Sequence, residues 1–349
     1  MNVIHVGLGT RGRRWLALVQ DHPGMKAVGC VDSGQSTLEW TKSQFANLTD
    51  ACYTRLEGAL TDRKADAAIV ASPIPLRAAH AVAALEAGLS VMIERPFAAS
   101  IADAARVLEA SRRSGRHVMV AQNCRFARCE RTLRQLVREG KVGRVTHVSC
   151  VDRRSLPPTN DDRAQTRHVQ LIHVAIDHFD TLRSILGLNP TSAIARSTTA
   201  PWSQYRHGST SEAIVEMEGD VYVQYHGTLT SSRDEHSLWI DGDKGTLWTN
   251  RTHVWWRKRG WPLFVPVLTR KAHAGGRSRD GMPVLLAQLQ AATLEKRPPE
   301  TSGEDNIFTL SMIEAAILSD KTGRVAHVNE LLSAAGIRST STANLHDAV

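Results

Sequence analysis

A glycine-rich loop near the N-terminus constrains the fold of this 349-residue chain more than any other feature. Gly7, Gly9 and Gly12 follow the short apolar run Val3–Val6 and precede the helical pattern Arg13–Gln20. In the pattern G-x-G-x-x-G the first glycine permits a tight turn and the second lets the backbone approach a pyrophosphate. The third lets the helix pack closely on the strand. The loop therefore predicts a nucleotide-binding βα unit.

Residues around these glycines predict which dinucleotide binds. Thr10 and Arg11 lie within the loop, where the free N–H groups and the positive end of the helix would face phosphates. Asp32 stands twenty positions beyond Gly12, at the end of a second strand-like run, Lys26–Val31. An acidic side chain there can bind the ribose hydroxyls of NAD and repel the extra phosphate of NADP. Since no arginine follows directly, NAD is expected and NADP is disfavoured.

Strand-like and helix-like patterns alternate through the first 121 residues. Helices are expected at Leu76–Ala87 and Ile101–Ser114, and a glycine stops each of them. The further strands expected here are Ala67–Ala71, Ser90–Ile93 and His117–Ala121. Such alternation is typical of βαβ units, so we expect an α/β fold with a doubly wound parallel sheet, a Rossmann domain, at residues 1–121.

After residue 121 the pattern changes to a series of strands among fewer helices. The expected helices are Glu130–Glu139, Leu171–Leu186, Met282–Leu294 and Glu304–Leu318. The expected strands are Val145–Asp152, Ser192–Thr198, Glu212–Glu218, Val221–Thr230, Leu238–Asp241, Thr246–Asn250 and Thr252–Arg257, with a loop at Arg153–Thr166. Successive hairpins favour a largely antiparallel open sheet. Residues 122–349 are therefore expected to form a second α/β domain for substrate binding and oligomerisation.

Composition narrows the class of protein. The net charge of +8 is scattered along the chain, which favours a basic surface over a nucleic-acid site. No apolar run approaches the ~20 residues of a membrane helix, and no signal sequence is visible, so a cytoplasmic protein is expected. The five cysteines form no CxxC pair, and His168 with His173 lacks a third ligand at metal spacing. No metal is therefore predicted.

Several stretches taken together resemble the Gfo/Idh/MocA oxidoreductase family. They are GLGTRG (7–12), ASPIPLRAAHAVAALEAGLSVMIERPFA (71–98), AQNCRFA (121–127), REGKVGRV (138–145), HVAIDHFDTLRSILG (173–187) and IDGDKGTLW (240–248). The resemblance implies a dinucleotide-binding domain, a second domain with an open sheet, and a site in the cleft between them. It also implies a sugar or polyol substrate and a homodimer or homotetramer.

The resemblance also implies catalytic positions, and this chain departs from the family at all of them. The family has a lysine in a Glu-Lys-Pro motif, where this chain has Glu94-Arg95-Pro96. The guanidinium of Arg95 cannot exchange a proton near neutral pH, but it can hold a substrate oxygen and stabilise negative charge there. Arg95 is thus expected to be catalytic and to contact the substrate, with simple pairing to Glu94 or another acid as the alternative.

The other two catalytic positions in the family are an Asp and a His four residues apart. Here His173 stands at the Asp position and Asp177 at the His position, and a small slip of the alignment would involve His178. Residues i and i+4 share a helix face. His173 could act as base with Asp177 orienting it, Asp177 could itself be the base, or the pair could only stabilise the helix.

Further site residues lie near the carboxyl ends of the expected strands. We expect the cofactor to contact the glycine loop and Asp32 together with Ser72, Pro73, His80, Glu94 and Asn123. The substrate is expected to contact Arg95, Arg125 and His178.

Two functions follow from this set. The first is NAD(P)-dependent hydride transfer to or from a sugar, polyol or related hydroxy compound. The alternative is a family member without net redox chemistry: a lyase or glycosidase that uses transient oxidation, or a cofactor-binding regulatory protein. The departures at Arg95, His173 and Asp177 support that alternative.

Overall fold

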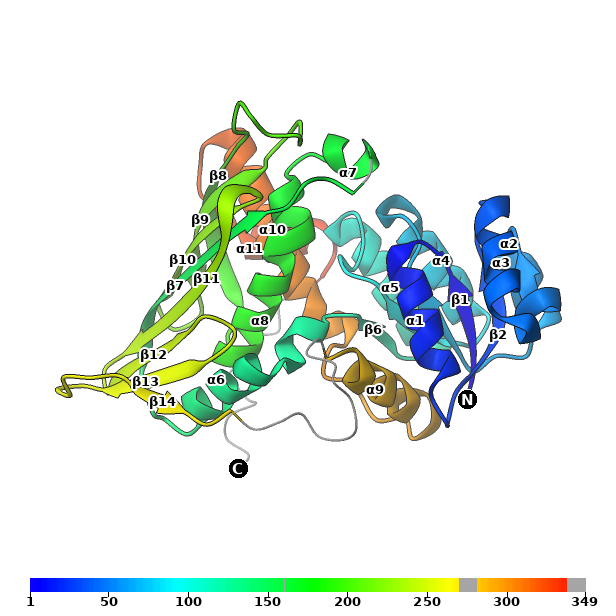
Figure 1. The fold of residues 1–349 in the computed structure, drawn as a ribbon, viewed down its shortest axis with the longest axis horizontal. Helices are drawn as coiled ribbons and strands as arrows, with labels where there is room; N and C mark the ends of the chain where they lie inside the picture. Colours follow the sequence, from blue (N-terminus) through cyan, green and yellow to red (C-terminus); the bar gives the residue numbers. More distant parts are fainter. Residues whose placement is uncertain (160, 270–280, 338–349) are drawn as a thin grey trace.

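Two sheets organise the computed structural model, and each lies in its own half of the molecule (Figure 1). The structure describes residues 1–159, 161–269 and 281–337. Within these residues no helix is both long enough and apolar enough to cross a bilayer.

The first sheet is parallel and has six strands in the order β3-β2-β1-β4-β5-β6. Its strands are β1 (Asn2–Val6), β2 (Lys26–Val31), β3 (Cys52–Tyr53), β4 (Ala67–Val70), β5 (Ser90–Ile93) and β6 (Val118–Val120). Its helices are α1 (Thr10–Gln20), α2 (Gln35–Gln44), the 3₁₀ turn η1 (Ala46–Ala51), α3 (Leu56–Asp62), α4 (Ile74–Glu86) and α5 (Ile101–Ser114). The predicted Rossmann sheet is confirmed; the two-residue β3 is too short to show a periodic pattern.

The second sheet has nine strands in the order β14-β13-β12-β11-β7-β10-β9-β8-β15. Only the β7–β10 pair is parallel, which confirms the largely antiparallel open sheet. The strands are β7 (Val145–Ser155), β8 (Pro190–Thr198), β9 (Thr210–Met217), β10 (Val221–Thr228), β11 (Thr230–Gly242), β12 (Gly245–Thr249), β13 (Val254–Lys258), β14 (Val265–Val267) and β15 (Ala326–His327).

Helices cover one face of this second sheet and link it to the first (Figure 1). They are the 3₁₀ turn η2 (Asn123–Phe126), α6 (Arg128–Arg138), α7 (Asp161–Gln165), the π-helical turn η3 (Leu171–Ala175), α8 (Ile176–Leu186), α10 (Gly303–Thr322) and α11 (Val328–Ala334). Helix α9 (Met282–Leu294) instead packs against the first sheet. Met282, Leu285 and Leu289 of α9 pack with Val3 and Met119 of the first sheet. The chain thus returns to the first core, which a simple division at residue 121 does not describe.

The strands β7 and β11 extend beyond the sequence-based expectation. The loop expected at Arg153–Thr166 instead continues β7 through Ser155 and contains α7. Strand β11 begins at Thr230, well before the expected Leu238–Asp241. Its first half is polar and largely exposed, so it lacks the apolar alternation that marks a strand in sequence, yet Glu235 and His236 pair with β7.

Candidate active site

The glycine loop lies between β1 and α1, where the order of the first sheet reverses. Gly7 has φ +88°, and a Cβ there would lie 2.5 Å from the Ser72 backbone nitrogen. A Cβ at Gly12 would lie 1.9 Å from the Gly7 carbonyl oxygen. At Gly9, by contrast, a Cβ would meet nothing within 4 Å. Gly7 and Gly12 are therefore fixed by packing inside the protein, while the backbone at Gly9 is open.

Asp32 lies directly after β2 beside this loop. Its Oδ2 accepts the Leu8 N–H at 2.7 Å, and its Oδ1 accepts the Gly34 N–H at 2.9 Å. These bonds hold a carboxylate next to the open loop and leave each oxygen a second lone pair. The loop, the uncapped start of α1 and Asp32 together fit a dinucleotide.

Three residues expected near the cofactor form one network. Glu94, which is 2% exposed, accepts hydrogen bonds from Arg11 Nε at 3.0 Å and from the Trp15 indole N–H at 2.7 Å. Arg11 also donates from Nη2 to Asn123 Oδ1 at 3.1 Å. Glu94 therefore anchors the start of α1 to the ends of β5 and β6. It holds Arg11 in place, and its buried position makes direct contact with a cofactor secondary to that role.

The segment after β4 is held by an arginine that sequence reasoning did not single out. Buried Arg77 on α4 donates from Nε to the Ser72 carbonyl and from Nη1 to the carbonyls of Glu94 and Pro96, each at 2.9 Å. His80 lies 3.0 Å from the Ser72 hydroxyl through Nδ1, and burial lowers the pKa of His80. An arginine within the alanine-rich pattern of this helix is the sequence signal for the role of Arg77.

Arg95 and Asp177 form an ion pair between the two halves of the molecule. Arg95 Nε lies 3.0 Å from Asp177 Oδ1, with the side chains 20% and 15% exposed. Arg95 Nη1 also donates to the His173 carbonyl at 2.9 Å. Burial lowers the pKa of Arg95, but Asp177 and Glu94 outweigh it and the pKa lies above its ordinary value. Arg95 thus stays cationic and holds the carboxylate of Asp177 at the end of β5.

His173 does not form the expected pair with Asp177. The two lie four residues apart, but His173 is part of the π-helical turn η3, whose wider turn shifts the phase of the helix face. No hydrogen bond or ion pair joins their described side chains, and Asp177 pairs with Arg95 instead. Burial and the charges of Arg163, Arg95 and Arg77 lower the pKa of His173 to about 3, so its imidazole is neutral at pH 7.

Arg125 is placed away from a substrate role. Its guanidinium is 3% exposed and pairs with Asp180 at 2.8 Å and with Asp305 at 2.9 Å. A buried guanidinium needs such partners, and they use its donors. The structure therefore assigns Arg125 to joining η2, α8 and α10.

His178 is buried between α8 and the second sheet rather than open to a substrate. It is 2% exposed, and its Nδ1 lies 2.9 Å from the Tyr225 hydroxyl. We retain neither Arg125 nor His178 as substrate ligands.

Arg154 is a neighbour of Asp177 that sequence reasoning missed. It lies near the end of β7, and its Nε donates to Asp152 Oδ2 at 2.6 Å. Burial lowers the pKa of Arg154, while Asp152 and Asp177 raise it to a net value above the ordinary one. Its position in an expected loop concealed its relation to the helix that carries Asp177.

This fold and site define a class: a two-domain protein with a Rossmann dinucleotide site and an acid–arginine pair between its domains. Residues 1–122 match the model of the oxidoreductase family with an NAD-binding Rossmann fold (GFO_IDH_MocA). Residues 131–248 match the GFO/IDH/MocA C-terminal domain. The chain belongs to this Gfo/Idh/MocA oxidoreductase family, as the resemblance predicted.

Individual relatives align with this chain over nearly its whole length. The 1,5-anhydro-D-fructose reductase of Ensifer adhaerens is 25% identical and covers 93% of this chain and 97% of its own. The D-apiose dehydrogenase of Paraburkholderia graminis is 24% identical over 97% and 92% of the two chains. An Agrobacterium radiobacter oxidoreductase, solved with NAD+, L-tartaric acid and magnesium, superposes with a TM-score of 0.84. It shares 17% identity and covers 95% of this chain and 99% of its own, so it supports the fold.

Proposed function

We propose that this protein is an NAD-dependent oxidoreductase that moves a hydride between the nicotinamide and a hydroxyl-bearing carbon of a sugar or polyol. The observation that carries this proposal is the Arg95–Asp177 ion pair, which provides a cation and a carboxylate next to the dinucleotide domain. The named substrates of the relatives, anhydrofructose and apiose, are carbohydrates and support that substrate class.

Each residue of the pair has a distinct task. Oxidation of an alcohol releases a hydride from carbon and a proton from the hydroxyl. When bound, the nicotinamide supplies the hydride chemistry. Asp177 accepts the hydroxyl proton, or returns it in the reductive direction, because its carboxylate is the proton-exchanging member of the pair. Arg95 donates a hydrogen bond to the reacting oxygen and stabilises its developing charge, as a guanidinium can without exchanging protons.

The departures from the family set are compatible with redox chemistry. Arg95 replaces a lysine, and Asp177 replaces a histidine, yet the pair still holds one group that binds anions and one that takes protons. A lyase, a glycosidase or a regulatory role is therefore not favoured. We further propose NAD as the preferred cofactor because of Asp32, together with a cytoplasmic location and a homo-oligomeric state.

Asp177→Asn tests the proton-transfer role because it keeps the shape of the side chain and removes the proton acceptor. Wild type and variant are assayed with NAD+ and a panel of sugars and polyols, and NADH affinity is titrated by fluorescence. We expect kcat to fall by about 10²–10⁴-fold, with NADH affinity changed by less than about threefold. His173→Asn is the matched control on the same segment, and we expect it to keep kcat within about tenfold.

Two results would contradict the proposal. If Asp177→Asn keeps wild-type kcat and kcat/KM, another group moves the proton. If wild type binds NADH tightly but shows no net oxidation or reduction with any carbohydrate, the redox function is wrong.

A further inference from the structure

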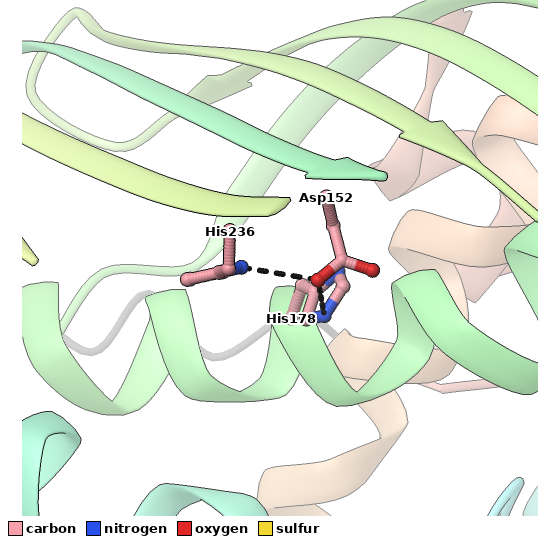
Figure 2. Close-up of side chains that lie close together, drawn as sticks. All are labelled: Asp152, His178 and His236. Atoms are coloured by element: carbon pink, nitrogen blue, oxygen red, sulfur yellow. Dashed lines mark hydrogen bonds and ion pairs between the residues drawn. The ribbon is translucent and has the colours of Figure 1, made fainter. Parts of the chain in front are cut away.

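Three side chains of the kinds that bind metals meet between α8 and the second sheet (Figure 2). Asp152 lies on β7 and His236 lies opposite it on the antiparallel strand β11, in direct register. His178 reaches toward them from α8. The side chains of Asp152 and His178 are almost fully buried, and that of His236 is 11% exposed.

Their ligand atoms have the spacing of a metal centre. His236 Nδ1 lies 3.1 Å and His178 Nε2 lies 3.5 Å from the same oxygen, Asp152 Oδ1. One ligand atom from each of the three residues lies within 4.8 Å of the others. Ions such as Zn²⁺ bind imidazole nitrogen and carboxylate oxygen at about 2.0–2.2 Å, so one ion between these atoms requires only small side-chain movements.

We propose that Asp152, His178 and His236 bind a divalent transition-metal ion of the zinc type. Two imidazoles and one carboxylate favour such ions over Mg²⁺ or Ca²⁺, which prefer sites made only of oxygen ligands. Three protein ligands leave a fourth position for water or another group. Since the residues come from three distant parts of the chain, no ligand spacing in the sequence could reveal the site.

The surroundings of His178 support an ion at its Nε2. That atom is buried and has no hydrogen-bond partner. On the other side of the ring, Nδ1 lies 2.9 Å from the Tyr225 hydroxyl, which also contacts Gln170 Nε2 at 2.6 Å. When Nδ1 donates its proton to Tyr225, the lone pair of Nε2 faces the cluster. Such an outer partner is the usual way in which a ligating histidine is oriented.

The two carboxylate oxygens of Asp152 have different main partners. Arg154 Nε donates to Oδ2 at 2.6 Å, and its Nη2 makes a longer contact with Oδ1 at 3.4 Å, while Oδ1 also faces both imidazoles. Arg251 Nη1 lies 3.4 Å from Oδ1 and would compete with a cation there. However, Arg251 Nε lies 3.8 Å from the carboxylate of Glu130, which is 8% exposed. Metal binding therefore requires Arg251 to turn from Asp152 toward Glu130, where its charge remains balanced, and Arg154 to keep only its bond to Oδ2.

An ion at this place would clamp α8 to β7 and β11. His178 follows Asp177 directly in the chain, so the clamp would also fix the start of the helix that carries Asp177. Without an ion, Asp152 Oδ1 instead serves as a shared acceptor for His236, Arg251 and Arg154, with His178 nearby. Metal binding by the intact protein distinguishes these two states of the cluster.

The test uses the full-length protein with any histidine tag removed. The protein is stripped with a chelator and then titrated with Zn²⁺, Co²⁺ and Mg²⁺ separately, with metal content measured by mass spectrometry. We expect one equivalent of Zn²⁺, the visible absorption of four-coordinate Co²⁺, no Mg²⁺ binding, and a higher Tm with Zn²⁺. His236→Ala should weaken Zn²⁺ binding by at least about 100-fold.

His226→Ala is the matched control. His226 lies on the neighbouring strand β10 and contacts the carboxylate of Glu212, but no third ligand joins that described pair. We expect it to bind Zn²⁺ like wild type. Fluorescence titration with NADH confirms that each variant is folded. The proposal is overturned if wild type binds no stoichiometric Zn²⁺ and its Tm does not rise. It is also overturned if His236→Ala binds as tightly as wild type, which would indicate an adventitious ion only.

Discussion

The glycine loop and the Arg95–Asp177 pair belong to the same candidate site but are assembled by different means. Within the loop, Gly7 and Gly12 contact each other five residues apart, and the conformation follows from local backbone geometry. Arg95 and Asp177 lie 82 positions apart and meet only because the second domain brings α8 to the end of β5. The first arrangement depends on small residues, while the second depends on charge.

This difference determines which substitutions the loop and the ion pair each tolerate. The loop uses backbone N–H groups, so its neighbours can vary as long as the glycines remain. The pair uses side chains, and this chain has an arginine and an aspartate where the resemblance implies a lysine and a histidine. In this protein, substitutions in the pair should therefore change substrate chemistry more than they change cofactor binding.

The largest effect is expected when Arg125 is replaced. The sequence suggested that Arg125 contacts the substrate, whereas the structure gives it a structural role. Arg125→Ala leaves Asp180 buried without its main partner. Breaking a buried ion pair from one side costs about 3–5 kcal/mol, so we expect the free energy of unfolding in urea to fall by that amount. Arg112→Ala, which removes an exposed pair with Glu109, should change it by less than about 0.5 kcal/mol.

This experiment also tests the division of roles. If Arg125→Ala is as stable as wild type and raises KM for a carbohydrate substrate, then Arg125 belongs to the substrate site. The η2 turn, which carries Arg125, would then be part of the substrate site.

Intermediate effects are expected at Gly12 and Gly9, where substitution should lower stability in the first case and NADH affinity in the second. Gly12→Ala places a Cβ 1.9 Å from the Gly7 carbonyl oxygen, so we expect a loss of about 1–3 kcal/mol in stability. Gly9→Ala meets open space and should cost about 1 kcal/mol or less. Its expected effect is on the ligand: NADH affinity should fall by at least about tenfold, equal to about 1.4 kcal/mol. Urea unfolding and fluorescence titration measure the two quantities. A Gly9→Ala variant with wild-type NADH affinity would show that the open backbone does not face the cofactor.

The sequence allowed the fold and the loop to be predicted because both rest on local patterns. Short apolar runs that alternate with helical patterns predicted β1, β2, β4, β5 and β6. The glycine spacing predicted the turn between β1 and α1.

The site required long-range information that no local pattern carries. The π-helical turn η3 changed the facing of His173 relative to Asp177 without any signal in the spacing. From the sequence, Arg125 could have bound a substrate, but in the folded protein it forms ion pairs with Asp180 and Asp305. Charged residues near strand ends can serve as site residues or as structural pairs, and only their partners distinguish the two roles.

The smallest effect, and the finest test of the loop, concerns Asp32. Asp32→Asn keeps one oxygen, which can accept from only one of the two N–H groups of Leu8 and Gly34, and it removes the charge that would repel a 2′-phosphate. We expect the preference for NADH over NADPH, measured as a ratio of Kd values, to fall by about tenfold, or about 1.4 kcal/mol. Asp66→Asn is the matched control, because Asp66 also accepts a backbone N–H, from Asn2 at 2.7 Å, but at the opposite end of β1. An unchanged ratio in Asp32→Asn would mean that another group reads the ribose. Arg13, which donates to the Leu8 carbonyl at 2.9 Å, is then the first residue to test.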